Sequence, residues 1–409
     1  MASIPPLLAI TREGSFCERW FANLVGKGVD LLLMVLYSHL GQIGLLLTAL
    51  AQAPAPPGAR VDLYTFGPGE DVFSKFGHAA LCVFDENGVG GRCFNYGSAD
   101  FSTPGPLTWD VVRGRARFWV AVTSFGEMLR LYLAEDRTIY RQRLPLKSEQ
   151  VEKMRQRLET AALPENRYYE YDHFKDNCST RPRDHIDAAV DGALRRRPTS
   201  HGSSFRELMH ENLEGDPFVF VLVETFLGRS IDQERTEYEA MFLPRTLRES
   251  VALHLGAAPE IVHARNPAPP SPSWLVTHRL GLALGIGLGS ALAIVLATPG
   301  ASFALRSVFG ALFGTVGVLL VLLAVVSPLA ELRYNELLLV WLPTDFLLIV
   351  GSRRVTSLYT NLRLAGLVAV GLLFLFGWLL QPLGPFWALA ALVLGATSAR
   401  TLVRSDGVR

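Results

Sequence analysis

Two residues of the chain have the chemistry of a nucleophile and its base. Cys178 stands in the string Asp-Asn-Cys-Ser-Thr-Arg, and His78 follows a glycine at the start of an apolar segment. The residue types around Cys178 are typical of a helix start, where free N–H groups favour a thiolate and lower the thiol pKa. A histidine within reach would take the thiol proton. The residues therefore predict a Cys-His nucleophile, and the alternative is a buried structural cysteine beside an ordinary structural histidine.

A third residue, Asn95, is expected to orient the imidazole of His78. Residues 78–84 and 92–97 read as two strands joined by the turn-rich loop 85–91. In such a hairpin the residues facing each other have numbers that sum to about 175, which makes Asn95 a diagonal neighbour of His78 on one face. Its amide oxygen would accept from one ring N–H while the other nitrogen serves the thiol. The alternative is that Asn95 only caps the strand end, because one bulge would turn it to the other face.

The same register places Cys82 directly opposite Cys93. Paired residues at such positions bring their Cβ atoms near the separation that a disulfide needs, and an exported domain meets an oxidising environment. We therefore predict a Cys82–Cys93 bond, which leaves Cys178 as the free thiol of that domain. The alternative is that two small apolar residues pack on adjacent strands.

Polar residues around the cysteine are candidates for substrate binding. The candidates are Asn177, Arg181 and Arg183, and the two arginines could hold a lipid phosphate or an acidic group. The alternative for Asn177, as for Asp176, is helix capping, and exposed, solvated side chains are the alternative for both arginines. The nine histidines show no metal-ligand spacing, so neither a metal nor a cofactor is expected.

The elements that must position these residues are strands first and helices afterwards, which predicts an α+β domain. Residues 60–67 form the first strand, ahead of the hairpin. Helices are expected over 124–135 and 148–161, from apolar residues at helical spacing. A third helix starts near Cys178 and runs past Val190, because Pro182 fits only in a first turn.

Beyond this domain the composition changes to that of a membrane protein. Of the 409 residues 49% are hydrophobic, and the last 137 residues hold only 13 of the 77 charged side chains. About five spans are expected from the apolar runs 280–297, 307–327, 337–351, 364–380 and 385–399, of which the third and fifth are short. Asp345 is the ionisable residue inside these runs, which marks it as functional by default, or as part of a wet re-entrant turn after Pro343. Asn335 is expected beneath the exported domain.

The amino-terminal segment and the arginines predict the topology. Leu31–Leu50 is apolar and ends in a small-x-small pattern, as in an export signal or an anchor helix. One set of alternate loops and the tail carries seven arginines, Arg363 among them, against two on the other side, which places the tail in the cytoplasm and the charged domain outside. The predicted divisions are 1–53 signal or anchor, 54–265 exported domain, 266–279 Pro-rich linker and 280–409 membrane bundle. A net charge of +1 argues against a generally basic nucleic-acid binder.

Four motifs in fixed order resemble the exported domain of the Lnb family of lipoprotein N-acylation transferases. They are Phe76-Gly-His-Ala-Ala, Phe94-Asn-Tyr-Gly, Tyr169-Glu-Tyr-Asp-His-Phe leading into Asp176-Asn-Cys-Ser-Thr-Arg, and Met241-Phe-Leu-Pro. The resemblance spans roughly residues 61 to 250. It implies a papain-like fold of the NlpC type in circularly permuted order, with His78 as base and Cys178 as nucleophile.

What the resemblance implies about function is acyl transfer at the bacterial cytoplasmic membrane, on its extracytoplasmic face. Cys178 would take an acyl chain from a lipid ester, such as a lipoprotein diacylglyceryl group, and pass it to an amine at a lipoprotein amino terminus. Two alternatives stay open. One is a cell-envelope amidase, endopeptidase or lipid hydrolase using the same residues, because fold does not fix substrate. The other is a non-catalytic membrane scaffold.

Overall fold

The computed structural model describes residues 58–71, 74–88, 90–196, 199–213, 216–266 and 299–405. The predicted export signal or anchor, the Pro-rich linker and the first apolar run, 280–297, lie outside these residues, as do the domain divisions that depend on them. The described residues all belong to one compact unit.

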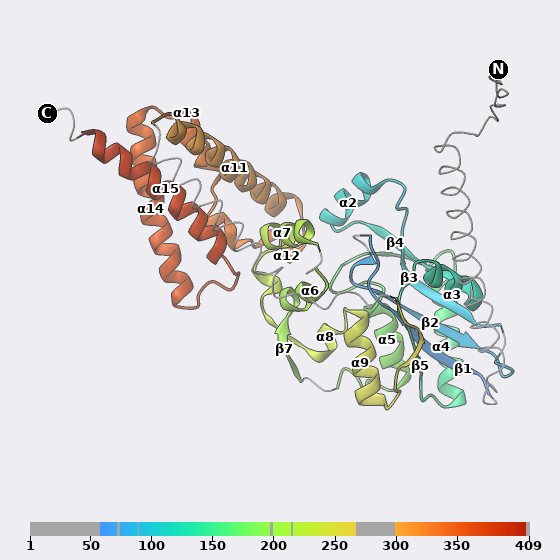
Figure 1. The fold of residues 1–409 in the computed structure, drawn as a ribbon. Coiled ribbons are helices and arrows are strands. Elements are labelled where there is room, and N and C mark those ends of the chain that lie inside the picture. Colours follow the sequence, from blue (N-terminus) through green and yellow to red (C-terminus); the bar gives the residue numbers. More distant parts are fainter. Residues whose placement is uncertain are drawn as a thin grey trace, which may run out of the picture. The chain divides into compact units, whose positions relative to one another are not determined.

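A seven-stranded antiparallel sheet is the centre of the amino-terminal domain (Figure 1). Its strand order is β6-β4-β3-β2-β1-β5-β9. The strands are β1 (Arg60–Phe66), β2 (His78–Phe84), β3 (Arg92–Ser98), β4 (Arg117–Ser124), β5 (Ile139–Arg143), β6 (Tyr168–Glu170) and β9 (Glu260–His263). Strands that are consecutive in sequence lie together at the middle, so β1, β2 and β3 form the meander that carries His78 and Asn95.

Helices cover both faces of this sheet. One face packs against α4 (Ser148–Ala161), α5 (Thr180–Ala189) and α9 (Pro244–Leu255), in a core that contains Leu81 and Met154. On the opposite face lies α3 (Phe125–Ala134), where Tyr132 stacks on Phe66 with 3.6 Å between ring centroids. A short α2 (Pro104–Val112) connects β3 to β4.

Local sequence signals explain where the helices begin. The Ser124 side chain accepts from the Glu127 N–H while the Glu127 carboxylate accepts from the Ser124 N–H, a capping box that starts α3 within the predicted range. Helix α4 has the predicted bounds, and α5 has Pro182 in its first turn, as expected. Helix α5 ends at Ala189, so the expected extension past Val190 is wrong, because the chain turns at Asp191, which has a positive φ of 55°.

The hairpin formed by β2 and β3 has the predicted register and the predicted disulfide. Ala80 pairs with Asn95 and Cys82 with Cys93, and the two cysteines are bonded. Both cysteines are fully buried. The bond joins the two strands two positions from Asn95 and thereby holds them in the register that the site needs.

A second group of helices lies beside the sheet, with its own apolar cluster around Phe174, Phe205 and Phe242. Its elements are β7 (Ser200–Ser204), α6 (Phe205–Leu213), α7 (Pro217–Phe226), η2 (Arg229–Ile231), β8 (Glu234–Thr236) and α8 (Glu237–Ala240). Strands β7 and β8 pair as a separate two-stranded sheet.

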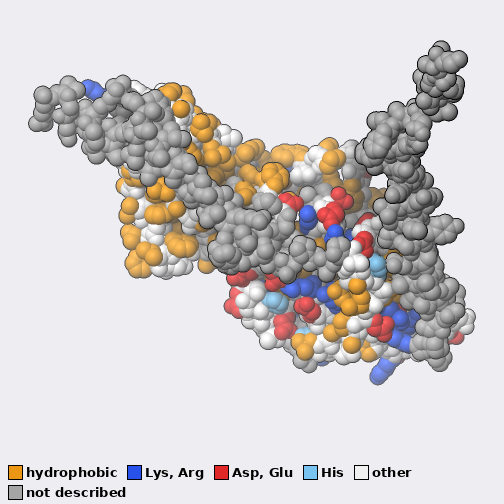
Figure 2. Space-filling model, in the orientation of Figure 1, with side chains coloured by type: hydrophobic (Ala, Val, Ile, Leu, Met, Phe, Trp, Pro, Cys, Tyr) orange, Lys and Arg blue, Asp and Glu red, His pale blue; other side chains and the backbone are white. Residues whose placement is uncertain are grey.

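The carboxyl-terminal region is helical. Its elements are α11 (Pro299–Val326), α12 (Ala330–Arg333), η3 (Glu336–Leu339), η4 (Pro343–Phe346), α13 (Leu347–Val350), α14 (Arg353–Leu375) and α15 (Gly384–Ser405). Two helices of the described chain, Phe303–Val326 and Arg354–Leu375, are long and apolar enough to cross a membrane, and Gly384–Gly395 is a shorter apolar helix. In Figure 2 hydrophobic side chains dominate the visible described part of this region, whereas acidic and basic ones gather over the sheet domain.

The run 337–351 forms no continuous helix. Three short helices replace it, because Pro343 interrupts the chain and Asp345 folds back to accept from the Leu342 N–H at 2.8 Å. The break expected at Pro343 is therefore found, but the Asp345 side chain is fully buried and does not lie in a wet turn. Five complete spans are not established in the described residues.

Asp345 pairs with Arg363 inside the bundle. Arg363 Nε lies 2.8 Å from Asp345 Oδ1, and neither side chain is more than 5% exposed. Arg363 lies inside α14 and its side chain is buried against Asp345, so counting it among the arginines of the loops is wrong. Arg363 directly precedes an apolar run, as a loop arginine would, and its partner Asp345 lies 18 residues away in the chain. The local sequence therefore gives no sign that this arginine is buried. The predicted orientation of the tail stays a prediction.

Candidate active site

Cys178 lies immediately before the first turn of α5. The N-cap is Ser179, and the Asn177 Oδ1 accepts from the N–H groups of Ser179 and Thr180 at 2.7 and 2.9 Å. Asn177 is buried and its Nδ2 donates to the carbonyl oxygens of His173 and Phe242. The polar atoms of Asn177 are thus used to build the helix start, which leaves the half-buried Cys178 thiol beside it.

His78 is hydrogen-bonded to Asn95 across the hairpin. Nε2 of His78 lies 3.4 Å from Oδ1 of Asn95. The Asn95 amide nitrogen donates to Thr123 Oγ1 at 3.1 Å and to the Cys93 carbonyl at 3.4 Å, and these bonds point its oxygen at the ring. With the Nε2 proton donated to Asn95, Nδ1 is the basic nitrogen of His78.

Cys178 lies where β2 begins and β3 ends, beside the strand residue that follows His78. The backbone N–H of Ala79, the residue after His78, interacts favourably with the Cys178 sulfur. Gly97 has a φ of 93°, and a Cβ built on it would lie 3.0 Å from the Cβ of Cys178. A side chain at position 97 would therefore push the cysteine away from the hairpin, so this glycine is required for the close approach.

Aromatic rings and one arginine form the wall behind His78. The Tyr132 ring is stacked on the His78 ring at 5.8 Å between centroids, and Phe66 lies 5.9 Å from the same imidazole. The guanidinium of Arg137 lies 4.9 Å from the Tyr132 ring centroid. Arg137 is 4% exposed and its Nη2 has no hydrogen-bond partner among the described residues. An incompletely paired positive charge thus lies buried next to the site.

Burial of Cys178 and His78 favours the neutral form of each. Burial raises the pKa of the Cys178 thiol to about 11, while the Ala79 N–H and the Arg137 charge act in the lowering direction. Burial and then Arg137 lower the pKa of His78 to about 3, opposed by the hydrogen bond to Asn95. The expectation that the helix start lowers the thiol pKa is wrong for this state, because desolvation outweighs it.

Two tyrosines complete the surroundings of the thiol. Tyr169 and Tyr171 have raised pKa values, chiefly from burial and next from the charge of a Cys178 thiolate. Tyr171 is hydrogen-bonded to His173 Nδ1 at 3.1 Å. The Tyr169 hydroxyl is buried and has no partner among the described residues, which leaves a free O–H donor near the sulfur.

The two arginines that follow the cysteine differ in their surroundings. Arg183 is buried, donates to Asp184 and to the Tyr238 carbonyl, and stacks on the Tyr238 ring, so its contacts are structural. Arg181 is half-buried, pairs with Asp176 and lies over the Tyr169 ring at 4.2 Å.

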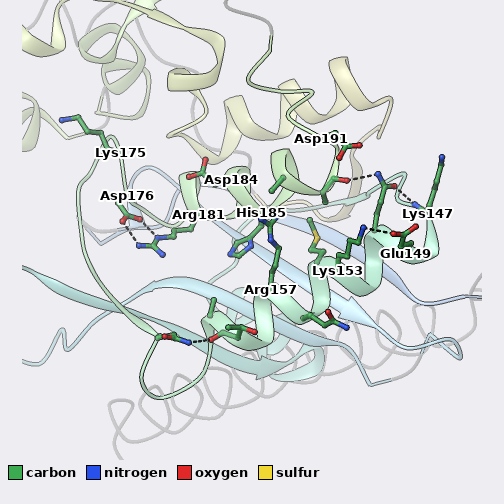
Figure 3. Close-up of a pocket in the computed structure, with 18 residues that line it drawn as sticks. Lys147, Glu149, Lys153, Arg157, Lys175, Asp176, Arg181, Asp184, His185 and Asp191 are labelled. Carbon is green, nitrogen blue, oxygen red and sulfur yellow. Dashed lines mark hydrogen bonds and ion pairs between the residues drawn. The ribbon is translucent and has the colours of Figure 1, made fainter.

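An open, polar pocket of about 1450 Å³ lies between α4 and α5 (Figure 3). Asp176, Arg181 and His185 line it, and Figure 3 shows Arg181 directed toward Asp176. Cys178 and His78 are not among the lining residues. The pocket therefore adjoins the helix of the nucleophile without containing the reacting atoms.

Sequence reasoning places Cys178, His78 and Asn95 together, and the structure brings all three to one end of the β2–β3 hairpin. It misses Tyr132, Arg137 and Tyr169. Tyr132 continues the apolar face of α3 after Met128, a signal of packing that says nothing of His78. Arg137 is one residue in the turn before β5, and no local pattern distinguishes it from a solvated arginine. No group of three His, Cys, Asp or Glu side chains that could hold a metal ion occurs in the described residues.

The comparisons with known proteins agree with the resemblance read from the motifs. No curated protein and no solved structure matches the chain. A family model described as the Lnb N-terminal periplasmic domain matches residues 53–210, which include His78, Asn95 and Cys178 and exclude the helical carboxyl-terminal region. The stretch that carries the site is thus similar to the periplasmic domain of the Lnb family, in agreement with the resemblance seen in the motifs.

Proposed function

We propose that this protein is a membrane-bound cysteine acyltransferase. It takes an acyl chain from a lipid ester and passes the chain to an amine, with a lipoprotein as the preferred substrate. The observation that supports this most is the arrangement of Cys178 beside a hairpin that carries an Asn95-oriented His78, in a chain whose following helices are apolar. We place the domain outside the cytoplasmic membrane, as a permuted papain-like fold.

The first half of the reaction forms a thioester. The Cys178 proton passes to Nδ1 of His78 as sulfur attacks the ester carbonyl carbon, and Asn95 stabilises the resulting imidazolium. The C–O ester bond breaks, the acyl group stays on sulfur, and the lyso product leaves with the proton from His78. The buried Tyr169 hydroxyl is the available donor for the oxyanion, because the N–H groups of Ser179 and Thr180 are already bonded to Asn177.

The second half transfers the chain to nitrogen. An amine attacks the thioester carbonyl, His78 takes the amine proton, and the C–S bond breaks to give an amide. The departing thiolate recovers the proton from the imidazolium, which restores the neutral pair. Arg181 is our candidate for a contact with an acidic group of the substrate, since it lines the open pocket whereas Asn177 and Arg183 are buried.

The deciding experiment is mass spectrometry of both the enzyme and lipoprotein amino termini. The purified protein, incubated with a diacylated lipoprotein in detergent, is expected to carry a fatty acyl group on Cys178 that hydroxylamine removes. Cells that contain the protein should yield lipoproteins with an N-acyl chain and one free glycerol hydroxyl. Cys178→Ala is the control in both assays.

The alternative outcomes separate the other functions. A fatty thioester without N-acylated product would identify a lipid hydrolase that uses the same residues. Cleaved cell-wall peptide with no fatty adduct would identify an amidase or endopeptidase. Absence of any adduct and of any product, with lipid and peptide substrates both offered, would favour the non-catalytic scaffold.

A further inference from the structure

Helix α7 (Pro217–Phe226) is apolar on almost every side. Its sequence, Pro-Phe-Val-Phe-Val-Leu-Val-Glu-Thr-Phe, carries only two polar residues, Glu224 and Thr225, and both are buried. A helix of this kind is ordinarily surrounded by protein or by lipid.

Two sides of α7 are occupied by protein. Val219, Phe220 and Val223 pack on the cluster around Phe205, and Phe226 packs against the apolar core of the carboxyl-terminal bundle. A further side is open. Phe218 is 71% exposed and Leu222, one turn later on the same side, is 38% exposed.

The carboxyl end of α7 is joined to the bundle by main-chain contacts. The Thr225 carbonyl accepts from Asn335 Nδ2 at 2.9 Å, and the Gly228 N–H donates to the Glu331 carbonyl at 2.7 Å. Gly228 passes so close to Tyr334 that a Cβ would collide with its backbone. The carboxyl end of α7 is thus fixed to the segment around α12, which follows α11, a helix apolar enough to cross a membrane.

The amino end of α7 is joined to the loop that precedes His78. Asp216 caps the helix by accepting from the Val219 N–H, and Lys75 pairs with the same carboxylate at 3.4 Å. Phe76 packs on the apolar cluster that underlies α7. The helix therefore spans from the bundle to a point three residues before the proposed base.

We propose that α7 is an interfacial helix whose Phe218 and Leu222 side chains insert into the outer leaflet of the membrane beside the bundle. The occupant of this surface is lipid, because the exposed residues are wholly apolar and lie next to the bundle contact. A second part of the proposal rests on the proposed function. The inserted helix brings the outer leaflet close to the loop before His78, and the acyl ester reaches Cys178 from that leaflet.

Site-specific fluorescence in phosphatidylcholine nanodiscs tests the placement without any assay of activity. The full chain carries Cys17→Ser and Cys178→Ala, so a single introduced cysteine is labelled with an environment-sensitive nitrobenzoxadiazole dye. The test positions are Phe218→Cys and Leu222→Cys. Val318→Cys, half-exposed on α11, is the lipid-facing control, and Glu149→Cys on α4 is the aqueous control.

We expect blue-shifted emission, and quenching by spin-labelled phosphatidylcholine, at 218, 222 and 318 but not at 149. Quenching at 318 alone would overturn the placement of α7 while leaving the bundle in the membrane. A blue shift at 218 and 222 without lipid quenching would overturn it in favour of a protein partner or a second copy of the chain. No quenching at 318 would contradict the membrane placement of the bundle and, with it, this proposal.

A kinetic comparison tests the link to the active site. The Phe218→Ser, Leu222→Ser variant should slow acylation of Cys178 by bilayer lipid by at least about tenfold, the factor that 1.4 kcal/mol of lost lipid contact gives. Alkylation of Cys178 by iodoacetamide in water should stay at the parent rate, as in a Glu149→Ser control. Equal acylation rates in variant and parent would overturn the delivery role, and a loss of both reactions would indicate damage to the site itself.

Discussion

Two buried arginines, Arg363 in the bundle and Arg137 near the thiol, differ in how completely their guanidinium groups are hydrogen-bonded. Arg363 donates to both oxygens of Asp345 and to the Val340 carbonyl, and Asp345 also accepts from Tyr359 at 2.8 Å. Arg137 donates to the Gly67 carbonyl and to Glu135, whose side chain is 45% exposed, and its Nη2 has no partner in the described residues.

The difference separates a structural charge from one that acts on neighbouring groups. A buried ion pair with every bond made holds its elements in place and projects little field beyond them. A buried charge with an unmade bond shifts the titration of the groups around it, and Arg137 lowers the pKa of both Cys178 and His78. Four predictions sharpen this comparison, in order of expected effect.

The largest effect is expected at the groups on which Arg137 acts. Cys178→Ala and His78→Ala should each reduce acyl transfer by about 10⁴-fold or more, because the covalent route itself is lost. Both variants should stay folded, which thermal unfolding of the detergent-solubilised protein checks. Near-normal turnover of Cys178→Ser would refute the thiol mechanism.

Breaking the bundle pair should affect stability instead. Asp345→Asn or Arg363→Met leaves an uncompensated buried partner and should cost about 3 to 5 kcal/mol. The double variant should be more stable than either single one, because no charge is then left alone. A lower melting temperature in detergent for both single variants is the expected result, and additive losses in the double variant would show that the two residues do not act as a pair.

Removing the orienting amide should have an intermediate effect on rate. Asn95→Ala frees the His78 ring and should lower turnover roughly 10²-fold, the scale of a small misplacement of a reacting group. Thr123→Val removes only one of the bonds that hold the amide and should cost less. If the two variants were equally slow, the Asn95 oxygen would have no special role toward the imidazole.

The smallest effect concerns pH and tests Arg137 itself. With a thiol pKa of about 11, the alkylation rate of Cys178 should rise about tenfold per pH unit from pH 7 to 10, since the thiolate is the reactive form. Arg137→Met removes a lowering influence and should raise the thiol pKa, which slows alkylation throughout this range. Arg137→Lys should restore part of the rate.

Arg130→Met, on the exposed side of α3, is the matched control and should leave the pH profile unchanged. The control has to be run in Cys17→Ser protein, so that only one thiol is observed. A plateau in alkylation between pH 5 and 8 would instead indicate a preformed thiolate with a charged His78, against the neutral pair inferred from the burial of both groups.

The sequence contains the parts of this site that depend on local rules. The register that joins His78 to Asn95, the Cys82–Cys93 bond and the start of α5 at Pro182 all follow from strand alternation and helix-start chemistry. The thiol pKa does not follow, because burial depends on elements far apart in the chain.

The same limit explains what was missed. Arg137 reaches the site by packing on Tyr132, a residue of another element, and no local spacing encodes that contact. Arg363 has the local sequence of a loop arginine, and only its contact with Asp345, 18 residues away in the chain, shows that it is buried. When a residue acts through a partner from another segment, its role can be recognised only once the fold is known.

The disulfide between β2 and β3 can also be used to measure how often this part of the domain opens. Both sulfurs of the disulfide are fully buried, so a small reductant cannot reach the bond while the domain is closed. The free Cys178, by contrast, is partly exposed. Reduction of the bond requires the hairpin to separate from α3, which covers that face. The rate at which two new thiols appear under reductant therefore measures how often the core of the domain unfolds, and it does so without any substrate.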